Sequence, residues 1–150
     1  MRASVFLAAT FALTSIGMAQ TTEFKPGQVW TYRGALVPSS RMIVGAIDKP
    51  DNAVDTEIVS ISITDAPIDP KTGGEKTQTV PHLPVAADAL EKSVLELQGT
   101  AQIPDGFDEG YRIWREAFET GRGGFFTITV DEIVQVLQNS LSSREPENAK

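Results

Sequence analysis

Two groups of side chains in this 150-residue sequence have the chemistry that catalysis needs. The first is His82, the only histidine, which lies in the segment VPHLP. Together with a serine and a carboxylate, it would supply the parts of a nucleophilic hydrolase. The second is a group of carboxylates, Asp105, Asp108 and Glu109, since two carboxyl groups are enough for glycoside hydrolysis. A small hydrolase that uses His82 or a carboxylate pair is therefore one hypothesis for the function.

The residues around these groups do not form a catalytic motif. The sequence has no GxSxG element, and a single histidine excludes a two-histidine metal site within one chain. The absence of cysteine excludes a cysteine nucleophile and a thiolate metal site. Carboxylates in the first turn of a helix are also explained by the helix dipole. We therefore predict no catalytic residue, no cofactor and no metal ligand.

A third candidate is the glycine-rich segment ETGRGGFFTIT, which starts at Glu119 and surrounds Arg122 with three glycines. Phosphate-binding loops run from a strand through glycines into a helix N-terminus, where amides and the dipole meet the anion. Here the expected order is reversed, from helix through glycines to strand. We predict that Gly121 ends the helix in a left-handed conformation, and we keep Arg122 as a candidate contact residue.

The first residues have the pattern of a secretory signal. Arg2 precedes an apolar run, and the small residues Gly17 and Ala19 flank Met18. We expect residues 1–19 to be removed between Ala19 and Gln20, and the protein to be exported to the periplasm or the exterior. No second long apolar stretch follows, so we expect no stable membrane insertion after cleavage.

The composition is acidic, with 13 basic residues, 20 acidic residues and a net charge of −7. This charge repels nucleic-acid phosphates, and it attracts basic proteins. We therefore predict no nucleic-acid partner and consider a basic protein as the partner. The simpler explanation is that the charge keeps an exported protein soluble.

The hydrophobic pattern predicts an α+β fold. Alternating or β-branched runs predict three strands in QVWTY, SRMIVGAID and TEIVSISIT, and the last of these places Val59, Ile61 and Ile63 on one face. Four prolines predict a loop over most of residues 66–84, with a short hairpin near Thr72. Helices are predicted over residues 85–99, over 108–121 and from about Val130, with a short strand at FFTIT. The predicted order is β-β-β-α-α-β-α, a small antiparallel sheet with helices packed on one face.

We expect one domain over residues 20–141 and a disordered tail over residues 142–150. Trp30 and Tyr32 alternate along the first strand, and they would form a contact surface if the helices left their face uncovered. The candidate contact residues are therefore Trp30, Tyr32, His82 and Arg122.

Several segments, among them FKPGQVWTYR, HLPVAADALEKSV and GYRIWREAFETGRGGFFTITVDEIV, resemble small exported bacterial proteins of unknown function. The resemblance implies no catalytic or binding residue. The leading hypothesis is an exported acidic interaction module without catalytic activity, of the inhibitor or immunity type. The alternatives are the small hydrolase and a structural component of the cell envelope.

Overall fold

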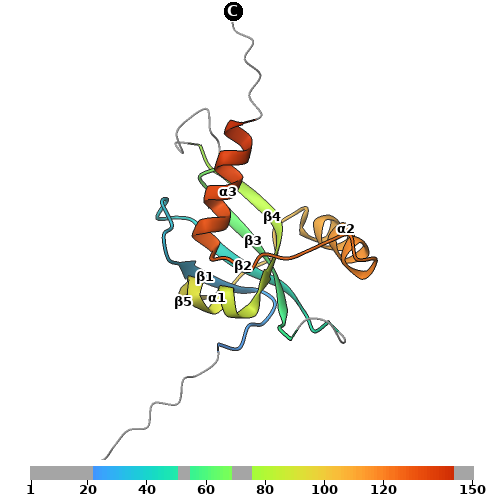
Figure 1. Ribbon diagram of the computed structural model, residues 1–150. Coiled ribbons are helices and arrows are strands. Elements are labelled where there is room, and N and C mark those ends of the chain that lie inside the picture. The colour runs from blue at the N-terminus through green and yellow to red at the C-terminus, as the bar shows by residue number, and fades with distance from the viewer. Residues whose placement is uncertain (1–21, 51–54, 69–75, 144–150) are drawn as a thin grey trace, which may run out of the picture.

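The computed structural model describes residues 22–50, 55–68 and 76–143, which form a five-stranded antiparallel sheet with three helices (Figure 1). The predicted α+β class is confirmed, and the order of elements roughly matches the prediction. The elements are β1 (Gln28–Tyr32), β2 (Arg41–Asp48), β3 (Ile58–Ala66), β4 (Gln78–Ala86), α1 (Ala87–Ser93), β5 (Val94–Thr100), α2 (Phe107–Glu119) and α3 (Val130–Ser142). The predicted signal peptide, the hairpin near Thr72 and most of the predicted tail lie outside the described residues.

The strand order in the sheet is β4-β3-β2-β1-β5, so the first four strands form a meander. Each of these strands pairs antiparallel with the next, whereas β5 pairs with β1 at the far edge. The register of β2 against β3 shifts between Val44 and Ala46, which places a β-bulge at Gly45. Within the described ranges, no helix has the length and apolar character that crossing a bilayer requires.

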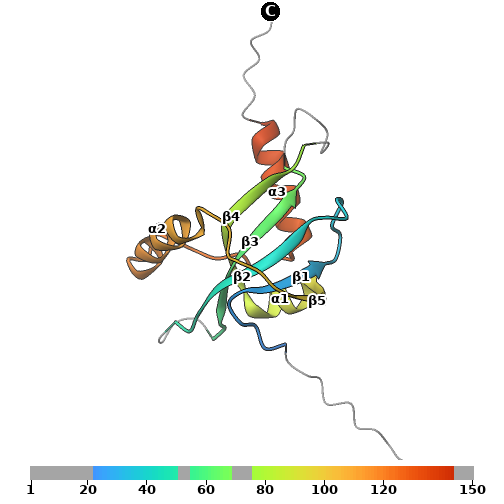
Figure 2. The same cartoon turned by 180° about the vertical axis from the view of Figure 1, so that it is seen from behind.

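The main hydrophobic core lies between one face of the sheet and helices α1 and α3. Val59, Ile61 and Ile63 of β3 are fully buried in this core, as their alternation predicts. Leu90 of α1 and Ile133 of α3 pack into the same cluster with no exposed surface. Figure 1 shows α3 in front of the sheet, and Figure 2 shows the sheet from the other side with α3 behind it.

Helix α2 lies on the other face of the sheet, beside β4. Ser60 and Ser62, which alternate with the core residues of β3, have no exposed surface. His82 of β4 reaches Ser60 on that face, and the ring of Phe107 at the start of α2 lies over Gly45 of β2. Figure 2 shows α2 beside β4 and the connection from β5 to α2 crossing this face. The face that the sequence predicts as polar is therefore partly covered.

The helix predicted over residues 85–99 is wrong in its second half. Helix α1 ends at Ser93, and β5 follows directly. The apolar residues of this segment divide accordingly: Leu90 and Val94 are buried, but Leu97 is 51% exposed. The outer edge of β1 needs hydrogen-bond partners, and pairing with β5 supplies them. This long-range pairing overrides a local helical pattern.

The loop predicted over residues 66–84 is also partly wrong, because β4 occupies Gln78–Ala86. Pro81 and Pro84 lack an amide hydrogen, and a central strand needs its amides to pair with the neighbouring strands on both of its sides. Strand β4 tolerates them because it is an edge strand that pairs in the sheet with β3 alone.

The strand predicted at FFTIT is reduced to one parallel bridge between Phe126 and Val85. The start of α3 was predicted correctly at Val130. The carboxylate of Glu132 accepts hydrogen bonds from the amide and the hydroxyl of Thr129, at 2.9 and 2.7 Å. This is the capping box that the Thr129–Glu132 spacing indicates.

Ser93 joins the end of α1 to the start of α3. Its hydroxyl donates to the Ala89 carbonyl at 2.8 Å and accepts from the Val130 amide at 3.0 Å, and neither Ser93 nor Val130 is exposed. Replacing Ser93 with alanine leaves that buried amide without its partner, so we expect a loss of about 1–2 kcal/mol in unfolding free energy. Urea denaturation measures this loss.

The control is Ser140→Ala on α3, since Ser140 makes a similar bond to the Val136 carbonyl but is exposed. We expect this variant to stay within about 0.5 kcal/mol of the wild type. Equal losses in the two variants would contradict the role assigned to Ser93.

Candidate functional site

His82 lies under α2, among three aromatic rings. Its ring centroid is 5.5 Å from that of Phe107, 5.9 Å from that of Tyr111 and 5.6 Å from that of Trp114. Its Nε2 atom is 3.0 Å from the hydroxyl of Ser60. Gly110 permits this approach, because a β-carbon at that position would lie 2.8 Å from the β-carbon of His82. The sequence predicted the helix over residues 108–121 but not this cluster.

The surroundings of His82 favour the neutral imidazole. Burial lowers its pKa from 6.5 to about 4, against the opposing effect of the Asp48 carboxylate. Ser60 has no exposed surface, so its hydroxyl cannot meet a substrate in this conformation. The geometry therefore indicates that His82 and Ser60 position α2 rather than form a nucleophilic pair.

A polar network beside His82 joins α2 to the end of β2. The hydroxyl of Tyr111 donates to the carboxylate of Asp48, with distances of 3.0 and 3.1 Å to its two oxygens. Arg115 forms an ion pair with the same carboxylate, and it also bonds Glu119 at 2.8 Å. Asp48 and Tyr111 are 63 positions apart, so only the fold reveals this network.

The glycine-rich segment is a helix end, as predicted. Gly121 has a φ of +71°, and its amide donates to the Phe118 carbonyl at 3.0 Å. The amides of Arg122 and Gly123 both donate to the Ala117 carbonyl, at 2.8 and 3.0 Å. These bonds form a Schellman motif. Three of the segment's amides are therefore used within the protein and do not face an anion, while the side chain of Arg122 remains exposed.

The pair formed by Trp30 and Tyr32 is not the exposed surface considered from the sequence. Tyr32 is only 3% exposed, and its hydroxyl lies 2.7 Å from that of Ser40. Burial raises its pKa. Trp30 is half-buried against the core and contacts Phe24 edge to face. Both rings lie on the face that α1 and α3 cover, so Tyr32 is excluded as a contact residue.

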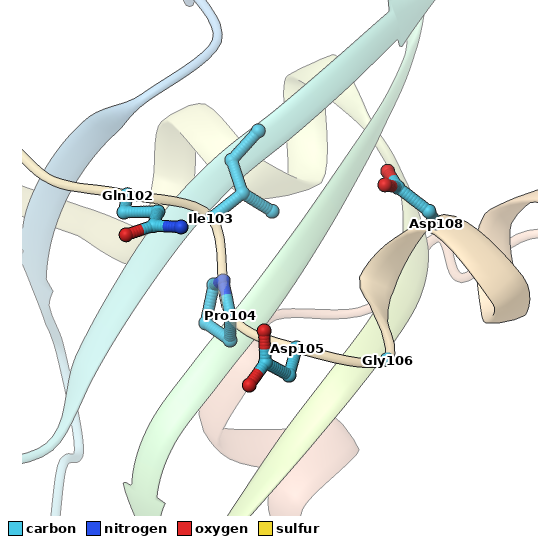
Figure 3. A pocket seen from close by; sticks show the side chains of 6 residues that line it. All are labelled: Gln102, Ile103, Pro104, Asp105, Gly106 and Asp108. Carbon is cyan, nitrogen blue, oxygen red and sulfur yellow. The ribbon is translucent and has the colours of Figure 1, made fainter.

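A hollow of about 380 Å³ lies where the chain passes from β5 to α2. Figure 3 shows the connection crossing in front of the strands, with Asp108 on the first turn of α2. The hollow is lined by Gln102, Ile103, Pro104, Asp105, Gly106 and Asp108. Among the described residues, no three potential metal ligands converge.

Strand β5 is one of the two edge strands of the sheet. Six of its seven residues are exposed, including Leu95 at 49% and Leu97 at 51%. Its inner side pairs with β1 through two register shifts, where the hydroxyl of Thr31 accepts from the Glu96 amide at 3.0 Å. Within the described part of the chain, no strand pairs with the outer side of β5.

No protein family, no curated protein and no solved structure matches this chain.

Proposed function

We propose that this protein is an exported acidic interaction module that binds a basic partner protein by adding an extended segment of the partner to β5. The main support for this proposal is the open edge of β5, with its two half-exposed leucines, Leu95 and Leu97. An exposed strand edge binds extended peptides through main-chain hydrogen bonds, and alternate side chains give selectivity.

The two edges of the sheet differ in a way that supports this proposal. On β4, Pro81 and Pro84 have no amide hydrogen to offer, and the main chain of Phe126 already bonds the Pro84 carbonyl and the Ala86 amide. Natural sheets block their edges with such devices, or with lysine, because an open edge recruits other strands. Strand β5 has neither proline nor lysine, so it is the edge available to a partner.

Charge indicates the chemistry of the partner. The protein carries a net charge of −7, which speeds encounters with basic proteins and slows those with acidic ones. Glu96 in the middle of β5 is exposed, and a basic residue opposite it would add about 0.2–1 kcal/mol. We therefore assign the partner a strand with apolar residues at alternate positions and at least one lysine or arginine. A protein of this kind would act as an inhibitor or immunity-type partner.

We expect immobilised protein to retain such a partner from a periplasmic extract at low salt and to release it at raised salt, because salt screens the charges. In Leu97→Lys, a charge replaces an apolar contact at the edge. We therefore expect it to bind the retained protein at least about tenfold more weakly, which corresponds to about 1.4 kcal/mol. Titration of the purified partner measures the affinity.

The matched control is Ile113→Lys on α2, since Ile113 is 54% exposed and Leu97 is 51% exposed. Both variants add the same charge, but only Leu97→Lys changes β5. Equal weakening by both would indicate a general charge effect and would contradict binding at the edge. Retention of no partner at any salt concentration would contradict the interaction module itself.

A further inference from the structure

Helix α2 is attached to the sheet mainly through contacts that lie outside the main core. The exception is the edge-to-face contact between Phe118 and Phe125, with ring centroids 6.3 Å apart, since Phe125 packs partly against that core. Phe107 is 3% exposed and Trp114 is 9% exposed, and both belong to the opposite face from the cluster around α1 and α3. Trp114 donates from its indole nitrogen to the Gly124 carbonyl at 2.7 Å. Figure 1 shows α2 standing to one side of the sheet, away from α3.

His82 lies at the centre of this attachment. The three rings around it, those of Phe107, Tyr111 and Trp114, all belong to α2. Its Nε2 atom reaches Ser60 of β3, which is fully buried. A proton added to His82 would therefore place a charge between an apolar helix face and a buried strand.

The charged and titratable groups nearby come from two elements. From β2, the Asp48 carboxylate attracts a charged His82 and so partly opposes the effect of burial. From α2, Tyr111 and Arg115 both bind that carboxylate, so it is already compensated. From β3, only the neutral hydroxyl of Ser60 bonds the ring. Burial remains the larger effect on the pKa of His82.

The sign of the pH effect follows from this difference. The pKa of His82 is about 4 with α2 in place and 6.5 in the solvated side chain, so the docked helix binds a proton more weakly than the released one. Docking is therefore strongest above pH 6.5 and weakens as the pH falls from 6.5 towards 4. The full difference between the two pKa values corresponds to a change of up to about 300-fold in the equilibrium between docked and released α2. Because the His82 ring is only half-buried, we expect a smaller change, of at least about tenfold.

We propose that α2 is a proton-released helix, which charging of His82 detaches from the sheet while the core beneath α1 and α3 stays folded. Release uncovers the apolar side chains of Phe107 and Trp114, which are 3% and 9% exposed when α2 is docked. Acidification would thus expose an apolar surface on an otherwise folded protein.

The test follows α2 and the core separately between pH 7.5 and 3.5. The chain has two tryptophans, Trp30 and Trp114. In a Trp30→Phe background Trp114 is the only one left, and its fluorescence reports on α2. Hydrogen exchange of the β3 amides reports on the core. We expect the Trp114 emission to move to longer wavelength below pH 6.5 while the β3 amides stay protected. Loss of both signals at the same pH would overturn the proposal, because α2 would not be released separately.

Two variants in the same background assign the transition. His82→Gln has a polar side chain of similar length that does not titrate, so the Trp114 transition should disappear or move below pH 4. Asp48→Asn removes the carboxylate that favours charged His82 and also weakens the bonds of Tyr111 and Arg115 that hold α2. The transition should therefore remain visible, while the titration midpoint of the His82 ring itself moves to lower pH. Persistence in His82→Gln together with loss in Asp48→Asn would assign the transition to Asp48 and overturn the proposal.

A direct measurement applies even if His82→Gln does not dock α2. His82 is the only histidine, so its ring proton signal in NMR is unambiguous. We expect its titration midpoint to lie at least about one pH unit below 6.5. A midpoint at or above 6.5 with α2 docked would overturn the proposal.

Discussion

Replacing Leu90 with alanine is expected to lower the free energy of unfolding by about 3–4 kcal/mol, which is the largest loss of stability that we predict for a single substitution. Leu90 has no exposed surface, and it belongs to the core between the sheet and the helices α1 and α3. Helix α1 has only seven residues, of which Ala89, Leu90 and Ser93 are buried. The substitution removes the largest of these side chains and leaves a cavity, and losses of 2–5 kcal/mol are typical of such changes.

Chemical denaturation measures this loss, with Glu91→Ala as the matched control. Glu91 is the next residue of the same helix and is exposed, so its removal should change stability by less than about 0.5 kcal/mol. A loss below about 1 kcal/mol for Leu90→Ala would show that α1 is not held by the core as described.

Replacing Gly45 with alanine is expected to displace α2 and to destabilise the protein by about 3 kcal/mol. A β-carbon at this position would lie 2.1 Å from Cζ of Phe107, with the neighbouring ring carbons at 2.2 and 2.7 Å. The ring is 3% exposed, so it cannot turn into solvent without leaving its site. The rest of α2 must then move with it. Denaturation gives the loss, and Trp114 fluorescence reports the displacement.

Two further variants separate this clash from a general glycine effect. Gly124→Ala adds the same methyl group where no atom lies within 4 Å, so it should have little effect. Phe107→Leu shortens the opposing side chain, so the double variant with Gly45→Ala should be at least about 1 kcal/mol more stable than the two single losses predict. Additive losses would indicate that the two residues do not compete for the same space.

The predictions that depended only on residues close together in the sequence were accurate. Val59, Ile61 and Ile63 were predicted on one face of a strand, because alternation requires only that the segment be extended. Gly121 and the Thr129–Glu132 pair marked helix ends correctly, since a cap forms between residues a few positions apart.

Predictions that depended on distant partners were less accurate. The run from Val94 to Thr100 is compatible with a helix by its periodicity, and it becomes β5 because β1 offers an edge to pair with. The prolines of β4 suggested a loop, and only its place at the edge of the sheet makes them acceptable. Tyr32 was considered as a surface residue, but the same face of β1 is covered by the core.

By itself, the sequence determined the α+β class, the alternation of β3, the ends of two helices and the acidic charge. These properties follow from composition and from interactions between residues close in the chain. Only the tertiary structure decided that His82 lies under α2 against Ser60, that Asp48 joins Tyr111 and Arg115, and that β5 presents an open edge. Ser60 and His82 are 22 positions apart, and Asp48 and Arg115 are 67 apart. Contacts over such separations form only when the whole sheet is assembled, because no local pattern in the chain specifies them.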